Sequence, residues 1–322
     1  MISSKFLGTV TVLVLTGCMN ATAPPVTGAG SSVSGGIGAA KPTGLTELAN
    51  LNYSNGEITV FSVSGNKAKK TASFTPGAAQ GLAMDARGRI YTTVTSASGK
   101  PCAACVEIFT SDGHLVRQLE APVLQSAPGA ASLSDISVDR HFNVYVSDYG
   151  QQAVYYFPKA NTHQQPVVVV QNSTNAASVL ATPNGANVVV SGGCGFASVR
   201  PYARTTSGQY QAGSCFNIGT IALIGGAVDD GIDVMTPVDG ALGLVSISSP
   251  SGGNAFSTPD QKHAEISGVA LSRNASVAYV ANHKCECVYA FARPSGGWLS
   301  GQPKVLATYR GFSQLDIIAV KQ

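Results

Sequence analysis

The amino-acid sequence contains an internal repeat, and this repeat restricts the fold more than any other feature. Similar segments begin at Gly81 ("GLAMDARGRIYTTV"), Asp135 ("DISVDRHFNVYVSD"), Val179 ("VLATPNGANVVVSG"), Gly225 ("GGAVDDGIDVMTPV"), Gly268 ("GVALSRNASVAYVAN") and Asp316 ("DIIAVKQ"). Equivalent turn positions lie 43 to 54 residues apart, at Asp85, Asp139, Pro183, Asp229, Ser272 and Val320. A period of this kind indicates one structural unit copied along the chain.

Each unit has the pattern of short β-strands joined by turns. A first apolar run leads through a polar turn to a second run, and a third strand follows, with clear alternation in Glu57–Phe61. Further third strands are predicted at Cys105–Phe109, Gln151–Phe157 and Cys285–Phe291. A repeat of ~40–50 residues built from such strands is typical of a β-propeller blade. The sequence therefore predicts an all-β, six-bladed β-propeller over residues 45–322.

Several segments resemble known propeller units. "LAMDARGRIY" and "ISVDRHFNVYVSDYG" resemble NHL-type repeats, and "VALSRNASVAYVANH" resembles a YncE-type unit. The whole of residues 45–322 resembles the NHL, YncE-like and gluconolactonase-type propellers. The resemblance implies a central channel lined by the first strand of each blade. It also implies closure of the ring: "DIIAVKQ" is a first strand with nothing after it, and "ELANLNYSNGEITVF" lacks a first strand, so the C-terminal strand should complete the N-terminal blade.

The N-terminus has the pattern of an exported, lipid-anchored protein. Residues 1–17 hold one lysine, Lys5, and an apolar run from Phe6 to Leu15 that is too short to span a bilayer. Leu15-Thr16-Gly17-Cys18 resembles the bacterial lipobox, in which the cysteine is lipidated. Position 19 holds methionine and not the aspartate that is typical of lipoproteins retained at the inner membrane. In a Gram-negative cell, we therefore expect the protein to be anchored in the outer membrane and to face the periplasm. Residues 18–44 then form the lipidated cysteine and a flexible tether rich in Gly, Ser, Ala and Pro.

Six cysteines remain after Cys18, and an even number in an exported chain favours disulfides. The predicted pairs are Cys102–Cys105, Cys194–Cys215 and Cys285–Cys287. A zinc site stays open as an alternative if the first and third pairs converge. Val106 follows Cys105 where a haem-attachment motif requires histidine, so haem is excluded.

Two groups of polar residues recur in phase with the repeat. Asp85, Asp139 and Asp229 occupy turns, where aspartate caps its own backbone, and we predict a structural role for them. A second group lies at the opposite end of the first and second strands, where the resemblance implies a channel mouth. In gluconolactonase-type relatives that mouth holds a divalent cation, which here would be Ca²⁺ or Zn²⁺. These candidate ligand or metal-site residues are Asp135, Asp316, Asp148, Asn52, Asn282 and His283.

No catalytic residue can be named from the sequence. Glycine stands at positions equivalent to Asp135 and Asp316 in three units, so we expect no fold-forming role for these two aspartates. The family's metal-binding glutamate on the first inner strand has no clear match, which puts a lactonase-like site in doubt. Hydrogen bonding to loop backbones and channel water is the alternative use of the same polar groups.

The charge pattern excludes nucleic acid as a partner. The net charge is +3, and the longest basic run, Lys67-Ala68-Lys69-Lys70, is short, has no interleaved aromatic residue and is predicted to be a solvated hairpin turn. The expected partners are the membrane, through the lipid anchor, and an envelope protein or a small ligand. The resulting hypothesis is a binding or scaffolding module that acts through the channel-mouth loops. A metal-dependent lactone or ester hydrolase is the alternative, and a structural protein without a small ligand is a third reading.

Overall fold

The structure, a computed structural model, describes residues 44–95, 104–120, 132–160, 165–171, 176–191, 194, 197–218, 225–238, 243–260 and 264–321. The predicted signal peptide, Cys18, all of the predicted tether except Gly44, and Cys102 lie outside these residues. Two short 3₁₀ helices occur, η1 (Pro158–Ala160) and η2 (Trp298–Ser300). Within the described ranges, no helix is long and apolar enough to cross a membrane.

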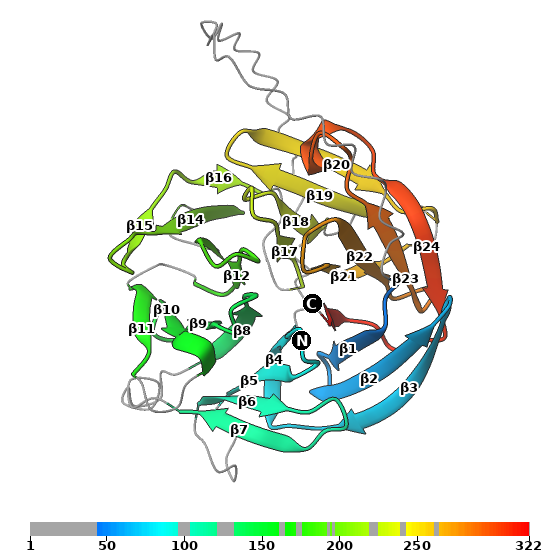
Figure 1. The fold of residues 1–322 in the computed structure, drawn as a ribbon, viewed down its shortest axis with the longest axis horizontal. Helices are drawn as coiled ribbons and strands as arrows, with labels where there is room; N and C mark the ends of the chain where they lie inside the picture. The colour runs from blue at the N-terminus through cyan, green and yellow to red at the C-terminus, as the bar shows by residue number, and fades with distance from the viewer. Residues whose placement is uncertain are drawn as a thin grey trace, which may run out of the picture. The chain divides into compact units, whose positions relative to one another are not determined.

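The strands form six antiparallel blades arranged around a common centre (Figure 1). Blade 1 holds β25 (Ile317–Val320), β1 (Glu47–Asn52), β2 (Glu57–Ser64) and β3 (Lys67–Phe74). Blade 2 holds β4 (Ala78–Met84), β5 (Ile90–Thr95), β6 (Cys105–Phe109) and β7 (Leu115–Leu119). Blade 3 holds β8 (Leu133–Val138), β9 (Val144–Asp148), β10 (Ala153–Phe157) and β11 (Val167–Val170).

The other three blades follow the same order from the centre outward. Blade 4 holds β12 (Val179–Ala181), β13 (Asn187–Ser191), β14 (Ser198–Arg204) and β15 (Tyr210–Ala212), and β16 (Phe216–Asn217) also pairs with β14. Blade 5 holds β17 (Ala227–Val228), β18 (Val234–Pro237), β19 (Leu244–Ser249) and β20 (Gly252–Ser257). Blade 6 holds β21 (Ile266–Leu271), β22 (Val277–Asn282), β23 (Cys287–Ala292) and β24 (Lys304–Arg310). The predicted six-bladed, all-β propeller is confirmed.

Ring closure follows the prediction from the two chain ends. The last strand, β25, pairs antiparallel with β1, with Leu48 opposite Val320 and Leu51 opposite Ile317. It therefore forms the innermost strand of the blade that begins the chain. The outer edges of blades 6 and 1 also meet, through a parallel pairing of Arg310 with Lys67. The two blades consequently form one eight-stranded sheet.

The hydrophobic core consists of layers between neighbouring blades. Six clusters of buried residues each combine side chains from two adjacent blades. In β13, Val188 and Val190 pack toward blade 3, whereas Val189 packs toward blade 5. A strand buried on both faces has no polar face, which explains its continuous apolar run.

Glycine is required where inner strands approach each other closely. A Cβ added to Gly81 would lie 2.8 Å from the Cα of Asp135, and one added to Gly268 would lie 2.8 Å from the carbonyl oxygen of Asp316. Backbone atoms of the neighbouring blade already occupy those positions. These glycines within the inner strands therefore reflect packing around a narrow channel.

The basic segment differs from its prediction as a hairpin turn. Lys67 and Lys70 lie in the outer strand β3, and the turn consists of Gly65 and Asn66. Gly65 has φ +57°, which glycine adopts without steric strain, so the chain turns before Lys67. The lysines are exposed on the outer strand, where their charged groups remain in contact with water.

Two of the three predicted cysteine pairs fall within the described residues. The disulfide Cys194–Cys215, with Cα atoms 6.1 Å apart, connects the segment after β13 to the segment before β16, and the prediction of this pair is confirmed. A second disulfide joins Cys285 to Cys287 across a Cα separation of 5.1 Å, which is shorter than the ~6.5–7 Å of an extended strand because the loop bends. Cys105 is also disulfide-bonded, and its predicted partner lies outside the described residues.

The two described disulfides should contribute unequally to stability. Cys194–Cys215 spans 21 residues and Cys285–Cys287 spans 2, so the chain-entropy model gives losses of about 3 and about 1.5 kcal/mol on removal. We expect paired Cys→Ser variants to follow this order in urea unfolding, with the larger increase in m for the variant that lacks Cys194–Cys215, because its unfolded chain becomes less compact. An equal or reversed order would show that native-state contacts, and not loop closure, set the contribution.

Candidate functional site

The propeller has two faces with different chemistry. The turn face carries the turns between the first and second strands of the blades. The loop face carries the loops between the second and third strands and the connections between blades.

The turn aspartates have the structural role that was predicted for them. Oδ1 of Asp85 accepts the backbone N–H groups of Arg87 and Arg89 at 2.8 and 2.9 Å. Asp139 and Asp229 accept the N–H groups two and four residues later in the same way. This repeated cap closes the turn and fixes the direction of the residues that follow it.

On the loop face, Asn52, Asp148 and Asn282 occupy equivalent positions at the ends of second strands. All three are buried, and Oδ1 of each accepts a backbone N–H from the loop that follows, at 3.0 to 3.1 Å: Ser54, Gln151 and Lys284 respectively. In Asp148 and Asn282 the same oxygen also accepts an N–H from the connection before the inner strand. These residues therefore hold the loop face together, as the turn aspartates hold the turn face.

The carboxylate of Asp148 is the chemically unusual member of this group. Its side chain is fully buried, and Oδ2 has no hydrogen-bond partner among the described residues. Burial raises its pKa, while the backbone N–H groups that it accepts act in the opposite direction. The equivalent positions in blades 1 and 6 carry neutral asparagine.

The residue after each cap presents a planar ring on the loop face. Tyr53 and Tyr149 are each 50% exposed, and the side chain of His283 is 45% exposed. The backbone N–H of each ring residue bonds back toward the start of the inner strand, with Ser132 O for Tyr149 and Glu265 O for His283. The N–H of Tyr53 instead donates to the carboxylate of Asp316, so the backbone of all three ring residues is held by the segment before an inner strand.

Asp316, His283 and Asn52 meet where blade 6 joins blade 1. Nδ1 of His283 lies 3.0 Å from Leu315 O and 3.5 Å from Oδ1 of Asp316. Oδ2 of Asp316 accepts the N–H of Tyr53 at 3.1 Å. Nδ2 of Asn52 donates to Gln314, in the same connection as Asp316. This arrangement directs Nδ1 of His283 into the protein, and Nε2 makes no hydrogen bond within the described part of the chain.

Asp135 lies deeper than the other predicted residues. It lines a cavity of about 90 Å³ between the inner strands, which is too small for a drug-sized ligand. Its side chain is 5% exposed, and its two oxygens accept the N–H groups of Ile136 and Val179. Burial raises its pKa to about 7, because these two bonds only partly compensate for lost hydration.

The expectation that Asp135 and Asp316 have no fold-forming role is wrong. Asp135 joins the inner strand of blade 3 to that of blade 4 through Val179. Asp316 lies in the segment between β24 and β25, and its carboxylate accepts the N–H of Tyr53 in the loop after β1. Its own backbone N–H donates to Oδ1 of Asn50 at 2.7 Å. Glycine at equivalent positions of other blades reflects the close approach of strands. It does not indicate that the residue type at these positions is unimportant for the fold.

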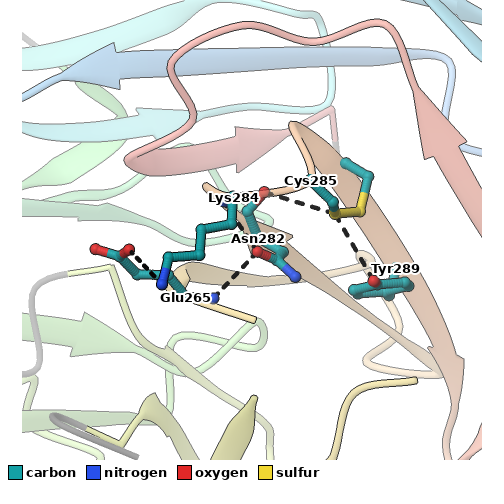
Figure 2. The surroundings of a disulfide bond; sticks show 6 residues. Glu265, Asn282, Lys284, Cys285 and Tyr289 are labelled. Carbon is teal, nitrogen blue, oxygen red and sulfur yellow. Dashed lines mark hydrogen bonds and ion pairs between the residues drawn. A yellow bond between two sulfur atoms is a disulfide. The ribbon is translucent and has the colours of Figure 1, made fainter. Parts of the chain in front are cut away.

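The cysteine pair of blade 6 closes the loop that carries His283. Figure 2 shows this loop: Asn282 binds the N–H of Glu265, and Lys284 lies 3.9 Å from the carboxylate of Glu265. The hydroxyl of Tyr289 lies 3.7 Å from Sγ of Cys285. Glu286, between the two cysteines, has φ +47°. The disulfide therefore holds a tight loop beside an exposed histidine.

Each of the six residues named from the sequence bonds to a backbone group of the protein. Asp135 lies in the channel, whereas Asp148, Asn52 and Asn282 bind their own loops. Within the described ranges, no group of three or more His, Cys, Asp or Glu side chains is placed to hold a metal ion. Tyr53, Tyr149 and Gln314 were missed, although the two tyrosines follow their caps as His283 follows Asn282, and this shared phase could have identified them.

We predict that Asp148→Asn stabilises the protein at alkaline pH. The variant keeps the Oδ1 acceptor, as in Asn52 and Asn282. Because the folded-state pKa of Asp148 is raised, the wild type loses stability as pH increases, and the variant does not. The melting temperature of the variant should exceed that of the wild type at pH 8, by about 2 °C per kcal/mol, and the difference should shrink toward pH 4.

The reverse substitution, Asn282→Asp, is the matched control and should destabilise the protein at pH 8. A lower melting temperature for Asp148→Asn at every pH would contradict this account, because it would show that the charge is satisfied in the folded protein.

Comparisons with known proteins agree with the fold. No protein-family model and no curated protein matches the sequence. A chain in the crystal structure of a nidogen–laminin complex is similar at a TM-score of 0.57, with 13% identity over 87% of this chain and 99% of that one. A putative 6-phosphogluconolactonase from Bacteroides fragilis is similar at 0.51, with 11% identity over 85% and 97% of the two chains. A functionally unknown protein from Desulfotomaculum acetoxidans is similar at 0.50, with 11% identity over 86% and 88%. At these identities, the likeness concerns the fold alone.

Proposed function

We propose that this propeller is a binding or scaffolding module of the bacterial cell envelope, and that its loop face contacts an envelope protein or a small ligand. The observation that carries the proposal is the repeated placement of Tyr53, Tyr149 and His283 beside buried caps. Tyrosine offers a large contact area at a low cost in conformational entropy, together with a hydroxyl for hydrogen bonding. Loops held by buried hydrogen bonds lose little freedom when a partner binds.

The alternative, a metal-dependent lactone hydrolase, receives less support. A hydrolase of this type needs carboxylate and amide oxygens that converge on a cation. Here Asp135 and Asp316 accept backbone N–H groups, and Asn52 and Asn282 do so as well. His283 beside Asp316 is the one pair that favours the alternative, because a histidine held at Nδ1 can accept a proton at Nε2.

The same proposal includes an anchor at Cys18 and a location at the outer membrane, facing the periplasm, in a Gram-negative cell. The lipobox-like segment before Cys18 supports the anchor, and Met19 supports the location. The described disulfides are compatible with an oxidising compartment. A tether of about 25 residues would allow the propeller to reach partners ~25–30 Å from its anchor.

Replacing Cys18 with Ser should abolish lipidation. The wild-type protein from membranes should begin at Cys18 and carry the mass of its acyl chains, each buried methylene of which adds ~0.8 kcal/mol to membrane binding. The variant should be released or remain unprocessed. Intact-mass spectrometry checks this, and a wild-type mass without an acyl increment would contradict the anchor.

The loop-face proposal is tested by photo-crosslinking in cells. A photoreactive phenylalanine analogue at Tyr53 or Tyr149 should yield a discrete adduct, detected by gel shift for a protein and by intact mass for a small ligand. The same analogue at Val168, which is 42% exposed on outer strand β11, is the matched control. Adducts from the control position alone, or none from the loop face, would contradict the proposal. Lactone turnover that requires added Ca²⁺ or Zn²⁺ and is lost in Asp316→Asn would favour the hydrolase.

A further inference from the structure

The turn face holds a much larger cavity than the channel. It has a volume of about 810 Å³, within the range of ~300–1,000 Å³ that is typical of small-molecule sites. Ser272 lines both this cavity and the channel, so the cavity lies at the channel's other mouth. Gly44, Leu45 and Thr46, where the described chain begins, form part of its wall.

The charged residues around this cavity come from corresponding positions of different blades. Each directly follows a turn position of the repeat: Arg140 after Asp139, Asp230 after Asp229, Arg273 after Ser272 and Lys321 after Val320. Three cations from blades 3, 6 and 1 thus surround one opening. The repeat brings them together, although 181 residues separate Arg140 from Lys321.

The positive charges of this cavity are only partly neutralised. Lys321 lies 3.4 Å from Glu47, and Oδ1 of Asp230 accepts the N–H of Asn184. Among the described residues, neither Arg140 nor Arg273 has a carboxylate within ion-pair distance. Nε of Arg140 donates to Nε2 of His141, which lines the same cavity. Two guanidinium groups are therefore left for an external anion.

The turns that carry these side chains are connected to one another. The N–H of Arg140 donates to Pro183 O of the next blade at 2.9 Å, and the N–H of Asn184 donates to Asp230 of the blade after that. The guanidinium of Arg87 lies 4.1 Å above the ring of Phe142 and connects blade 2 to blade 3. These contacts hold the backbone of the turns in blades 3, 4 and 5, so the turn that carries Arg140 has little backbone freedom to lose on binding.

A buried tyrosine forms part of the wall of this cavity. Tyr279 lines the wall and is 4% exposed. Burial, and secondarily Tyr309, raises its pKa to about 12, so its hydroxyl keeps its proton at physiological pH and can donate a hydrogen bond.

We infer that the cavity on the turn face binds a small organic anion through a phosphate or carboxylate group, held by Arg140 and Arg273. The planar guanidinium group matches both kinds of oxyanion with two parallel hydrogen bonds. Lys321 supplies a third positive charge, and Tyr279 a neutral donor. This site is on the face opposite the proposed partner site, and the two proposals are independent.

The test measures anion binding at constant ionic strength with the full chain carrying Cys18→Ser, so that no acyl anchor contributes. The probes are inorganic phosphate, glycerol 3-phosphate and citrate, titrated by calorimetry. We expect at least one probe to bind with a dissociation constant below 1 mM, on the order of tenfold tighter than to Arg140→Gln with Arg273→Gln. The conservative pair Arg140→Lys with Arg273→Lys should bind with intermediate affinity, because lysine keeps the positive charge but cannot form the two parallel hydrogen bonds of a guanidinium group.

Lys69→Gln with Lys304→Gln is the matched control, since it removes two positive charges from exposed positions of the outer strands β3 and β24. This control variant should bind the anion with the same dissociation constant as the parent protein, which carries only Cys18→Ser. Equal binding by the parent and the paired Arg→Gln variant, or equal weakening in the control, would overturn the inference and reduce these arginines to ordinary surface charges.

Vesicle flotation distinguishes the source of the anion. Vesicles of phosphatidylcholine with and without phosphatidylglycerol are compared for the same four proteins. Flotation that depends on phosphatidylglycerol and on the two arginines would identify a lipid headgroup. Calorimetric binding without such flotation would identify a soluble anion, and the absence of both would overturn the inference.

Discussion

The pairing of β25 with β1 is the interaction on which the remaining structure depends. Successive residues of β25 point into two different interfaces: Ile318 and Val320 pack between blades 6 and 1, whereas Ile317 and Ala319 pack between blades 1 and 2. One four-residue strand thus completes two of the six hydrophobic layers. Because each blade buries its faces against neighbours, a ring that failed to close would leave apolar sheet faces exposed to water.

This architecture separates the tasks of strands and loops. Second strands such as β13 and β22 are buried on both faces and accept few changes. Side chains available for recognition therefore come from the ends of these strands and from the outer strands. The loop face presents rings beside buried caps, and the turn face presents cations around a cavity. Both sets lie on backbone that side-chain hydrogen bonds hold in place, which reduces the entropy lost on binding.

Buried polar groups form a second network, which sets the relation between neighbouring blades. Asp135 binds Val179 of the next blade, and Asp316 binds Tyr53 across the junction of the chain ends. Without Asp135, the buried N–H of Val179 would lose its partner, which costs about 1–3 kcal/mol, whereas the N–H of Tyr53 is exposed and can bond to water. The same groups that resembled a cation site in the sequence are thus explained by the demands of backbone hydrogen bonding in a crowded ring.

The sequence by itself determined the six blades, the order of strands within them, the closing strand and the role of the turn aspartates, because all of these follow from the period and the phase of a repeat. It also placed Asn52, Asp148 and Asn282 at equivalent positions. Only the tertiary structure decided what these residues bind, since Asp135 accepts an N–H from the neighbouring blade 4 and Asp316 accepts one from a residue 263 positions earlier in the chain. The convergence of Arg140, Arg273 and Lys321 depends on the same closure: a repeat assigns residues to one face, but the radius of the ring decides whether they meet.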